Sequence, residues 1–204
     1  MQKSAFLATL LLFAGAGAAA AAAVTSAGAA PVAGLKAGLF EPPRAAPSIG
    51  LSASDGKPFD LARYRGKVVV LEFGFTHCVE VCPVSLASLA QARTLLGADA
   101  ASLQVVFVTV DPARDSVARL HDYLAQFDSA FIGVSGSTQQ VDAVLKAYGI
   151  SATKKMVEGS RTDYTMHHSS YLYFVDRRGM LRALMPYGRP AADIAHDVRL
   201  LLRD

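Results

Sequence analysis

The chain has 204 residues, of which 52% are hydrophobic and 18% are charged, with a net charge of +3, two cysteines and no tryptophan. This length allows one ordinary domain preceded by a targeting segment, and so small a net charge gives no argument for nucleic-acid binding. Two cysteines exclude a disulfide-rich scaffold, a four-cysteine zinc site and an ordinary iron–sulfur cluster. Composition therefore directs attention to the spacing of Cys78 and Cys82, which lie four residues apart.

The N-terminal segment, residues 1–30, predicts export from the cytoplasm. Lys3 is followed by an apolar run at 5–13 and then by an alanine- and glycine-rich tract. A short basic start, an apolar core and small residues behind it are typical of a secretory signal peptide. The same stretch is long enough to span a bilayer as an uncleaved anchor, with Lys3 on the cytoplasmic side. Both alternatives place the domain in the periplasm, either free or tethered to the inner membrane.

Residues 31–47 hold four prolines and two glycines, a composition typical of a linker. Residues 48–204 are assigned to one domain, in which apolar β-branched runs predict strands and apolar spacings of three and four predict helices. In chain order the expected elements are a strand at 68–75, a helix at 84–96, a strand at 103–110, a helix at 115–127, a strand at 131–134, a helix after Ser137 that stops at Gly149, a polar loop or hairpin at 151–166, strands at 169–175 and 180–187, and a helix around 194–202.

This order of elements predicts the fold class. Strands that alternate with helices imply a parallel core sheet, and the closing hairpin adds antiparallel pairing. We therefore expect an α/β protein with a central mixed sheet flanked by helices, which resembles the thioredoxin-like plan. In that plan the cysteine pair lies at the first junction between a strand and a helix.

The cysteine pair has the spacing of a reactive or metal-binding site. If Cys78 and Cys82 both lie at the start of a helix, positions i and i+4 share a face, so the sulfurs can form a disulfide or converge on one metal ion. Pro83 suits the first helical turn, and a helix N-terminus favours the thiolate that binds metals and attacks disulfides. A purely stabilising disulfide is the alternative, although so short a loop gains little from closure.

Two thiolates need a third ligand, usually histidine or methionine, to complete a trigonal copper site. Among the five histidines, His77 is expected to point away from the cysteines, and His121 and His196 are expected on solvated helix faces. His167 and His168 directly precede a buried strand on the loop side of the sheet. Adjacent residues of a strand point to opposite faces, so we expect one of these two to reach the cysteines, and the pattern does not choose between them.

Three motifs resemble those of the Sco/SenC copper proteins and occur in the same order. Residues 66–83, GKVVVLEFGFTHCVEVCP, resemble the family signature, residues 108–115 its second motif, and residues 166–176 its third, in which a histidine before a serine or threonine opens a strand. The resemblance spans about residues 45–203. It implies a thioredoxin-like fold that binds Cu(I) or Cu(II) through two cysteines and one histidine.

By position, the resemblance makes Cys78 and Cys82 the sulfur ligands and His168 the imidazole ligand, because His168 directly precedes a serine. The sequence departs from the family where Val-Glu at 79–80 replaces a common Pro-Asp. It departs again at His167, where aspartate is common, which leaves open an auxiliary ligand.

Two acids of the second motif, Asp111 and Asp115, also match the family. We expect structural roles for both, Asp111 in the turn that closes a strand and Asp115 as the N-cap of the next helix.

The resemblance also implies partners and a role. These are a cytochrome c oxidase subunit that carries a copper site, together with other copper chaperones, and a function in copper delivery or in reducing the thiols of that site. The competing hypothesis is a metal-free thiol–disulfide oxidoreductase, which would usually carry Cys-x-x-Cys and a proline where this chain has His168. A peroxiredoxin and a pure interaction module are weaker alternatives. We expect a metallochaperone rather than an enzyme.

Overall fold

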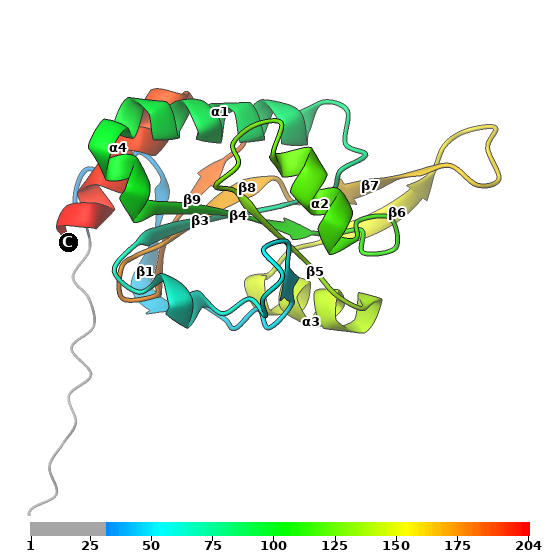
Figure 1. Ribbon diagram of the computed structural model, residues 1–204, viewed down its shortest axis with the longest axis horizontal. Helices are drawn as coiled ribbons and strands as arrows, with labels where there is room; N and C mark the ends of the chain where they lie inside the picture. Colours follow the sequence, from blue (N-terminus) through cyan, green and yellow to red (C-terminus); the bar gives the residue numbers. More distant parts are fainter. Residues whose placement is uncertain (1–31) are drawn as a thin grey trace, which may run out of the picture.

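The computed structural model describes residues 32–204, and the signal peptide or anchor expected at 1–30 lies outside them. Its centre is a seven-stranded sheet with the order β1-β9-β8-β3-β4-β5-β2 (Figure 1). Its strands are β1 (Gly38–Ala45), β2 (Ser52–Ala53), β3 (Val68–Gly74), β4 (Leu103–Thr109), β5 (Ile132–Ser135), β8 (Tyr171–Val175) and β9 (Met180–Pro186), and its helices are α1 (Val81–Leu96), α2 (Val117–Leu124), α3 (Thr138–Tyr148) and α4 (Ala191–Arg203). No helix among the described residues is long and apolar enough to cross a membrane.

The sheet is mixed, as the order of elements predicts. Strands β3, β4 and β5 run parallel, while β8 pairs antiparallel with β3 and β9 pairs antiparallel with β8. Two further strands, β6 (Ala152–Met156) and β7 (Tyr164–His168), form a separate antiparallel hairpin that projects beyond the helices (Figure 1). The polar segment at 151–166 is therefore a hairpin, and it extends as far as His168.

Each face of the sheet carries its own apolar core. Helices α1, α2 and α4 cover one face, and α3 with the segment at 49–64 covers the other. Side chains of a strand point alternately to the two faces, so Val68 and Val70 of β3 pack toward α1, and Leu71 and Phe73 pack toward α3. The carboxyl end of β3 is the point at which both layers meet the loop that leads into α1.

Part of the segment expected as a linker belongs to the sheet. Residues Gly38 and Leu39 of β1 pair with β9, and the register then shifts before pairing resumes at Arg44. The shift contains Pro42 and Pro43. Because proline has no N–H to donate, it is tolerated at such an irregularity of an edge strand, which is why a proline-rich stretch here still forms a strand.

Two helices begin at residues other than those expected, and one begins as predicted. Helix α1 starts at Val81, three residues before the expected start. Helix α2 starts at Val117 after the N-cap Ser116. Helix α3 follows Ser137, as the sequence pattern predicts, and Ser137 forms a capping box with Gln140.

Candidate metal centre

Cys78 and Cys82 lie together at the junction of β3 and α1, and both are free thiols. Cys82 is in the first turn of α1 and is 1% exposed, whereas Cys78 precedes the N-cap Glu80 and is half-buried. A shared helix face is expected if both cysteines belong to the helix. Only Cys82 does, so the two cysteines do not share a face. Instead the backbone N–H of Cys82 donates to Cys78 Sγ at 3.5 Å, so the sulfur of Cys78 accepts a hydrogen bond from the first turn of α1.

The environments of the two thiols shift their pKa values in opposite directions. A hydrogen bond from the Cys82 thiol lowers the pKa of Cys78 to about 5, and the backbone N–H groups of Glu80, Val81 and Cys82 act in the same direction against burial. The same shared proton, together with burial, raises the pKa of Cys82 above its ordinary value. At neutral pH the pair therefore consists of a half-buried thiolate and a buried thiol.

Gly74, the last residue of β3, makes room for the buried sulfur. A Cβ atom at this position would lie 2.8 Å from Cys82 Sγ and 2.7 Å from the ring of Phe107, closer than any real Cβ contact. We expect Gly74→Ala to destabilise the fold by about 1–3 kcal/mol, the usual range for overpacking a filled core, as measured by urea unfolding.

The matched control is Gly38→Ala, because Gly38 also lies in a strand and a Cβ atom there would meet only the carbonyl of Leu184 at 3.6 Å. Equal stability of Gly74→Ala and Gly38→Ala would contradict the close packing of Cys82 against β3.

His168 lies at the end of β7 and lines a narrow cavity together with Cys82, Tyr171 and Tyr187. Its Nδ1 is 2.9 Å from the carbonyl oxygen of Ser169. An Nδ1–H donated to that carbonyl fixes the tautomer and leaves Nε2 with a free lone pair, the usual arrangement of a metal-binding histidine. The structure thus brings His168 to the cavity beside the cysteines.

His167 is exposed on the other side of the same strand and pairs with Thr153 across the hairpin. The other three histidines also lie away from the cavity. His77 is exposed, with Nδ1 3.3 Å from Thr76 Oγ1. His121 is exposed on α2, and His196 on α4 bonds to Asp197.

Cys82 and His168 line one cavity and Cys78 contacts Cys82, but the three predicted ligands do not form a closed site. Among residues 32–204, no group of three or more histidine, cysteine, aspartate or glutamate side chains is close enough to hold a metal ion. A single ion held by Cys78, Cys82 and His168 would therefore require a shift of the loop or of the hairpin.

Glu72 of β3 is a site residue that the sequence analysis missed. It is 4% exposed, lines the same cavity as Cys82 and His168, and its Oε2 has no hydrogen-bond partner among the described residues. Burial raises the pKa of Glu72 to about 8, a contact with Ser85 opposes this, and the charge of Cys78 adds to it. A lone carboxylate within the apolar run of β3 is the signal that could have revealed it.

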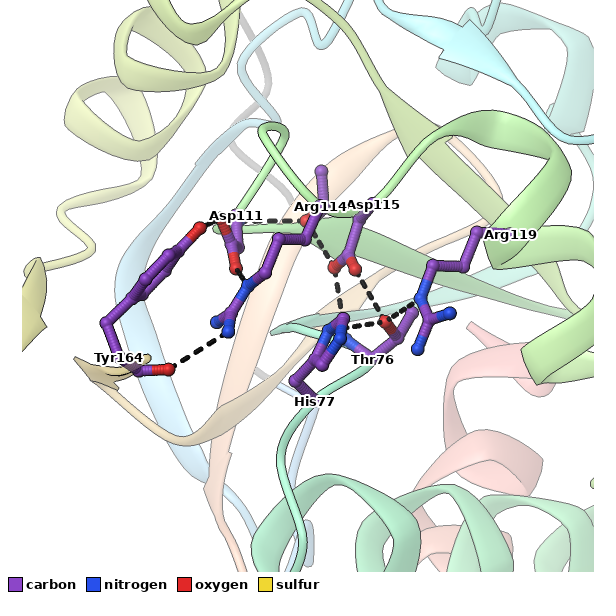
Figure 2. A network of polar contacts seen from close by, with 8 residues as sticks. Thr76, His77, Asp111, Arg114, Asp115, Arg119 and Tyr164 are labelled. Carbon is purple, nitrogen blue, oxygen red and sulfur yellow. Dashed lines mark hydrogen bonds and ion pairs between the residues drawn. The ribbon is translucent and has the colours of Figure 1, made fainter. Parts of the chain in front are cut away.

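Asp115 is not the N-cap of α2, in contrast to the expectation, because Ser116 takes that position. Its carboxylate is fully buried and accepts hydrogen bonds from Thr76 N at 3.0 Å, Thr76 Oγ1 at 2.6 Å and Thr109 Oγ1 at 2.8 Å (Figure 2). Arg119 donates to Thr76 Oγ1 at 2.6 Å. Asp115 therefore fixes the chain two residues before Cys78.

Asp111 occupies the expected turn, where its carbonyl accepts from the backbone N–H groups of Arg114 and Asp115. Its side chain also reaches the hairpin. Oδ1 accepts from the hydroxyl of Tyr164 at 2.9 Å, and Oδ2 accepts from Arg114 Nε at 2.5 Å (Figure 2).

Comparison with known proteins places these features in one family. The SCO1/SenC family model matches residues 41–203. The mitochondrial protein SCO2 of Saccharomyces cerevisiae is 35% identical over 130 residues, which cover 63% of this chain and 43% of that protein. The chain thus spans less than half the length of this relative.

Two solved structures share the fold. A structure of Bradyrhizobium japonicum ScoI with copper bound is 31% identical, with a TM-score of 0.65, and the match covers 77% of this chain and 96% of that one. The apo Sco1 protein of Thermus thermophilus is 29% identical, with a TM-score of 0.70 and coverage of 81% and 95%. This likeness confirms the predicted thioredoxin-like α/β class.

Proposed function

Since the chain belongs to the SCO1/SenC family, we propose that it is a periplasmic copper chaperone that binds one copper ion as cargo through Cys78, Cys82 and His168. It then delivers the ion to the copper site of a cytochrome c oxidase subunit. The observation that carries the proposal is that the thiol of Cys82 and an imidazole with a free Nε2, that of His168, line one cavity, with the thiolate of Cys78 in contact with Cys82. The copper bound in the structure of ScoI from Bradyrhizobium japonicum supports it.

The donor set suits copper in both oxidation states. Thiolates favour Cu(I), and a neutral imidazole also tolerates Cu(II). Because the pKa of Cys78 is lowered to about 5, one sulfur is already deprotonated at neutral pH and needs no proton release to bind. Cys82 must release its proton as the ion enters.

The surroundings of the cysteines leave a path for transfer. Val79, between the cysteines, is 87% exposed, and Tyr171 and Tyr187 at the cavity are each 40% exposed. A ligand from an acceptor protein can therefore approach the Cys78 side and replace the ligands of this chain one at a time. A cytochrome c oxidase subunit and other copper chaperones are the proposed partners, and the segment at 1–30 is the proposed signal or anchor for the periplasm.

The second candidate function is reduction of the thiols of the same acceptor site. The contrast between a half-buried thiolate at Cys78 and a buried thiol at Cys82 favours it, since the accessible sulfur can attack. Cys78 would attack an acceptor disulfide and form a mixed disulfide. Cys82 would then lose its proton and attack Cys78, releasing two acceptor thiols and leaving a Cys78–Cys82 disulfide.

Copper loading of the reduced full-length protein tests the proposed function. We expect one copper per chain in the wild type, and a loss of about a hundredfold in affinity in His168→Ala, since one ligand of a metal site is worth roughly 3 kcal/mol. Affinity is measured by competition with a chelator under anaerobic conditions.

The matched control is His167→Ala, the neighbour on the exposed side of β7, which should bind copper as the wild type does. If His167→Ala loses affinity and His168→Ala does not, the ligand assignment is wrong. If neither the wild type nor the variants bind copper, but the wild type reduces protein disulfides rapidly, the reductase function replaces the chaperone function.

A further inference from the structure

The hairpin that carries His168 is attached only lightly to the main sheet. Strands β6 and β7 pair with each other and belong to a two-stranded sheet of their own. Their residues are mostly exposed or half-buried, in contrast to the fully buried β3 and β4. With so little burial, packing of β7 contributes little to fixing the position of His168.

A polar latch, formed by Asp111, Arg114 and Tyr164, ties this hairpin to the loop between β4 and α2 (Figure 2). Arg114 Nη1 donates to the carbonyl oxygen of Tyr164 at 2.9 Å, Arg114 Nε donates to Asp111 Oδ2, and the Tyr164 hydroxyl donates to Asp111 Oδ1. The guanidinium carbon of Arg114 lies 3.6 Å from the centre of the Tyr164 ring. Asp111 and Arg114 contact each other, and both contact Tyr164, the first residue of β7.

The loop that carries Asp111 and Arg114 is also tied to the cysteine segment. The loop at 111–115 also contains Asp115, which holds the chain just before Cys78 through Thr76. The loop at 111–115 therefore contacts both the segment before Cys78 and the hairpin that carries His168. Phe75 lies between the two, with its ring centre 5.9 Å from the guanidinium carbon of Arg114 and 5.9 Å from the ring centre of His168.

We propose that the latch sets the position of His168 relative to the cysteines, so that Arg114 is a positioning residue for copper coordination. This inference rests on the proposed function. Arg114 is not a proposed ligand and would act through β7, whose first residue it contacts and whose last residue is His168. A planar guanidinium can bind a carboxylate, a carbonyl and a ring at once, which lysine cannot do.

The test compares Arg114→Met with a matched control, Arg63→Met. Arg63 also pairs with an aspartate, Asp55, at 2.7 Å, donates to the carbonyl of Pro58 and lies over the ring of Tyr64, but it is in the segment before β3. We expect Arg114→Met to lower copper affinity about tenfold, the lower end of the effect of residues that orient metal ligands, and to weaken the imidazole nitrogen coupling in the Cu(II) electron paramagnetic resonance spectrum. Arg63→Met should change neither.

A double-mutant cycle separates positioning from a general loss of structure. In the His168→Ala background, Arg114→Met should have no further effect on copper affinity, because the residue it positions is absent. An equal loss in both backgrounds would overturn the inference. Tyr164→Phe, which removes only the hydroxyl bond to Asp111, and Arg114→Lys should give intermediate losses.

Hydrogen exchange of the copper-free protein gives a readout that does not depend on metal. Arg114→Met should speed amide exchange in residues 164–168 relative to Arg63→Met, with the exchange of β3 unchanged. Failure of the wild type to bind copper would overturn the proposed function, while unchanged exchange in β7 would overturn the latch.

Discussion

Replacing either cysteine by serine is expected to lower copper affinity by about a thousandfold, the largest effect of any single change in this protein. Structural zinc sites with four ligands gain about 10–16 kcal/mol, or roughly 2.5–4 kcal/mol for each ligand, and the upper end of that range corresponds to about a thousandfold. Serine offers a neutral hydroxyl, a poor ligand for Cu(I). The measurement is a competition titration of Cys78→Ser and Cys82→Ser under reducing, anaerobic conditions.

The two serine variants should differ in stability. Cys82 is buried among apolar neighbours, so Cys82→Ser adds a polar hydroxyl to the core and should unfold at lower urea concentration. Cys78 is half-buried, and Cys78→Ser removes a thiolate whose lowered pKa stabilises the fold above about pH 5, so its loss of stability should grow as the pH rises. The control is Val79→Ser, which alters the same loop and leaves both sulfurs. Copper affinity within tenfold of the wild type in both cysteine variants would exclude a two-sulfur site.

The second large effect concerns Glu72 and the pH dependence of stability. Its pKa is raised to about 8 in the fold from an ordinary value of 4.5, so the native state holds a proton that the unfolded chain releases. Stability from this group is complete below about pH 4.5 and is lost as the pH rises through about 8. At 1.36 kcal/mol per pH unit, the loss between about pH 5 and about pH 8 is on the order of 4 kcal/mol.

Glutamine keeps the shape of the protonated carboxyl and does not titrate. The free energy of unfolding of Glu72→Gln, measured in urea across this pH range, should therefore exceed that of the wild type by an amount that grows with pH. The matched control is Glu158→Gln, because Glu158 is an exposed glutamate on the hairpin, and its profile should run parallel to that of the wild type. Parallel profiles for Glu72→Gln and the wild type would show that Glu72 is ionised in the fold.

Sequence patterns predicted the central elements because local composition determines them. The apolar run of β3, the spacing of α1 and the serine cap of α3 each need only nearby residues. The same reasoning failed where a distant partner decides the outcome. Strand β1 forms because β9 offers an edge.

For the site, the spacing of the cysteines and their place after β3 could be predicted, but the contrast between their environments could not. The pKa of Cys78 depends on hydrogen bonds from Cys82 and from the backbone of α1. The residue pattern alone left His167 and His168 open, and the choice of His168 came from the family resemblance; which of the two faces the cavity depends on the hairpin, where His168 lies opposite Ala152 and His167 opposite Thr153. Neither fact is carried by the composition of a single segment.

The two apolar layers of the fold imply that copper held by the proposed ligands would also have a mechanical effect. Cys82 belongs to the layer under α1, Cys78 packs against both layers, and Met166, two residues before His168, packs against the layer under α3. An ion held by Cys78, Cys82 and His168 would cross-link the two apolar layers at one end of the sheet. Under the proposed function, copper binding would then make the domain more rigid, and release of the ion would make it more flexible again.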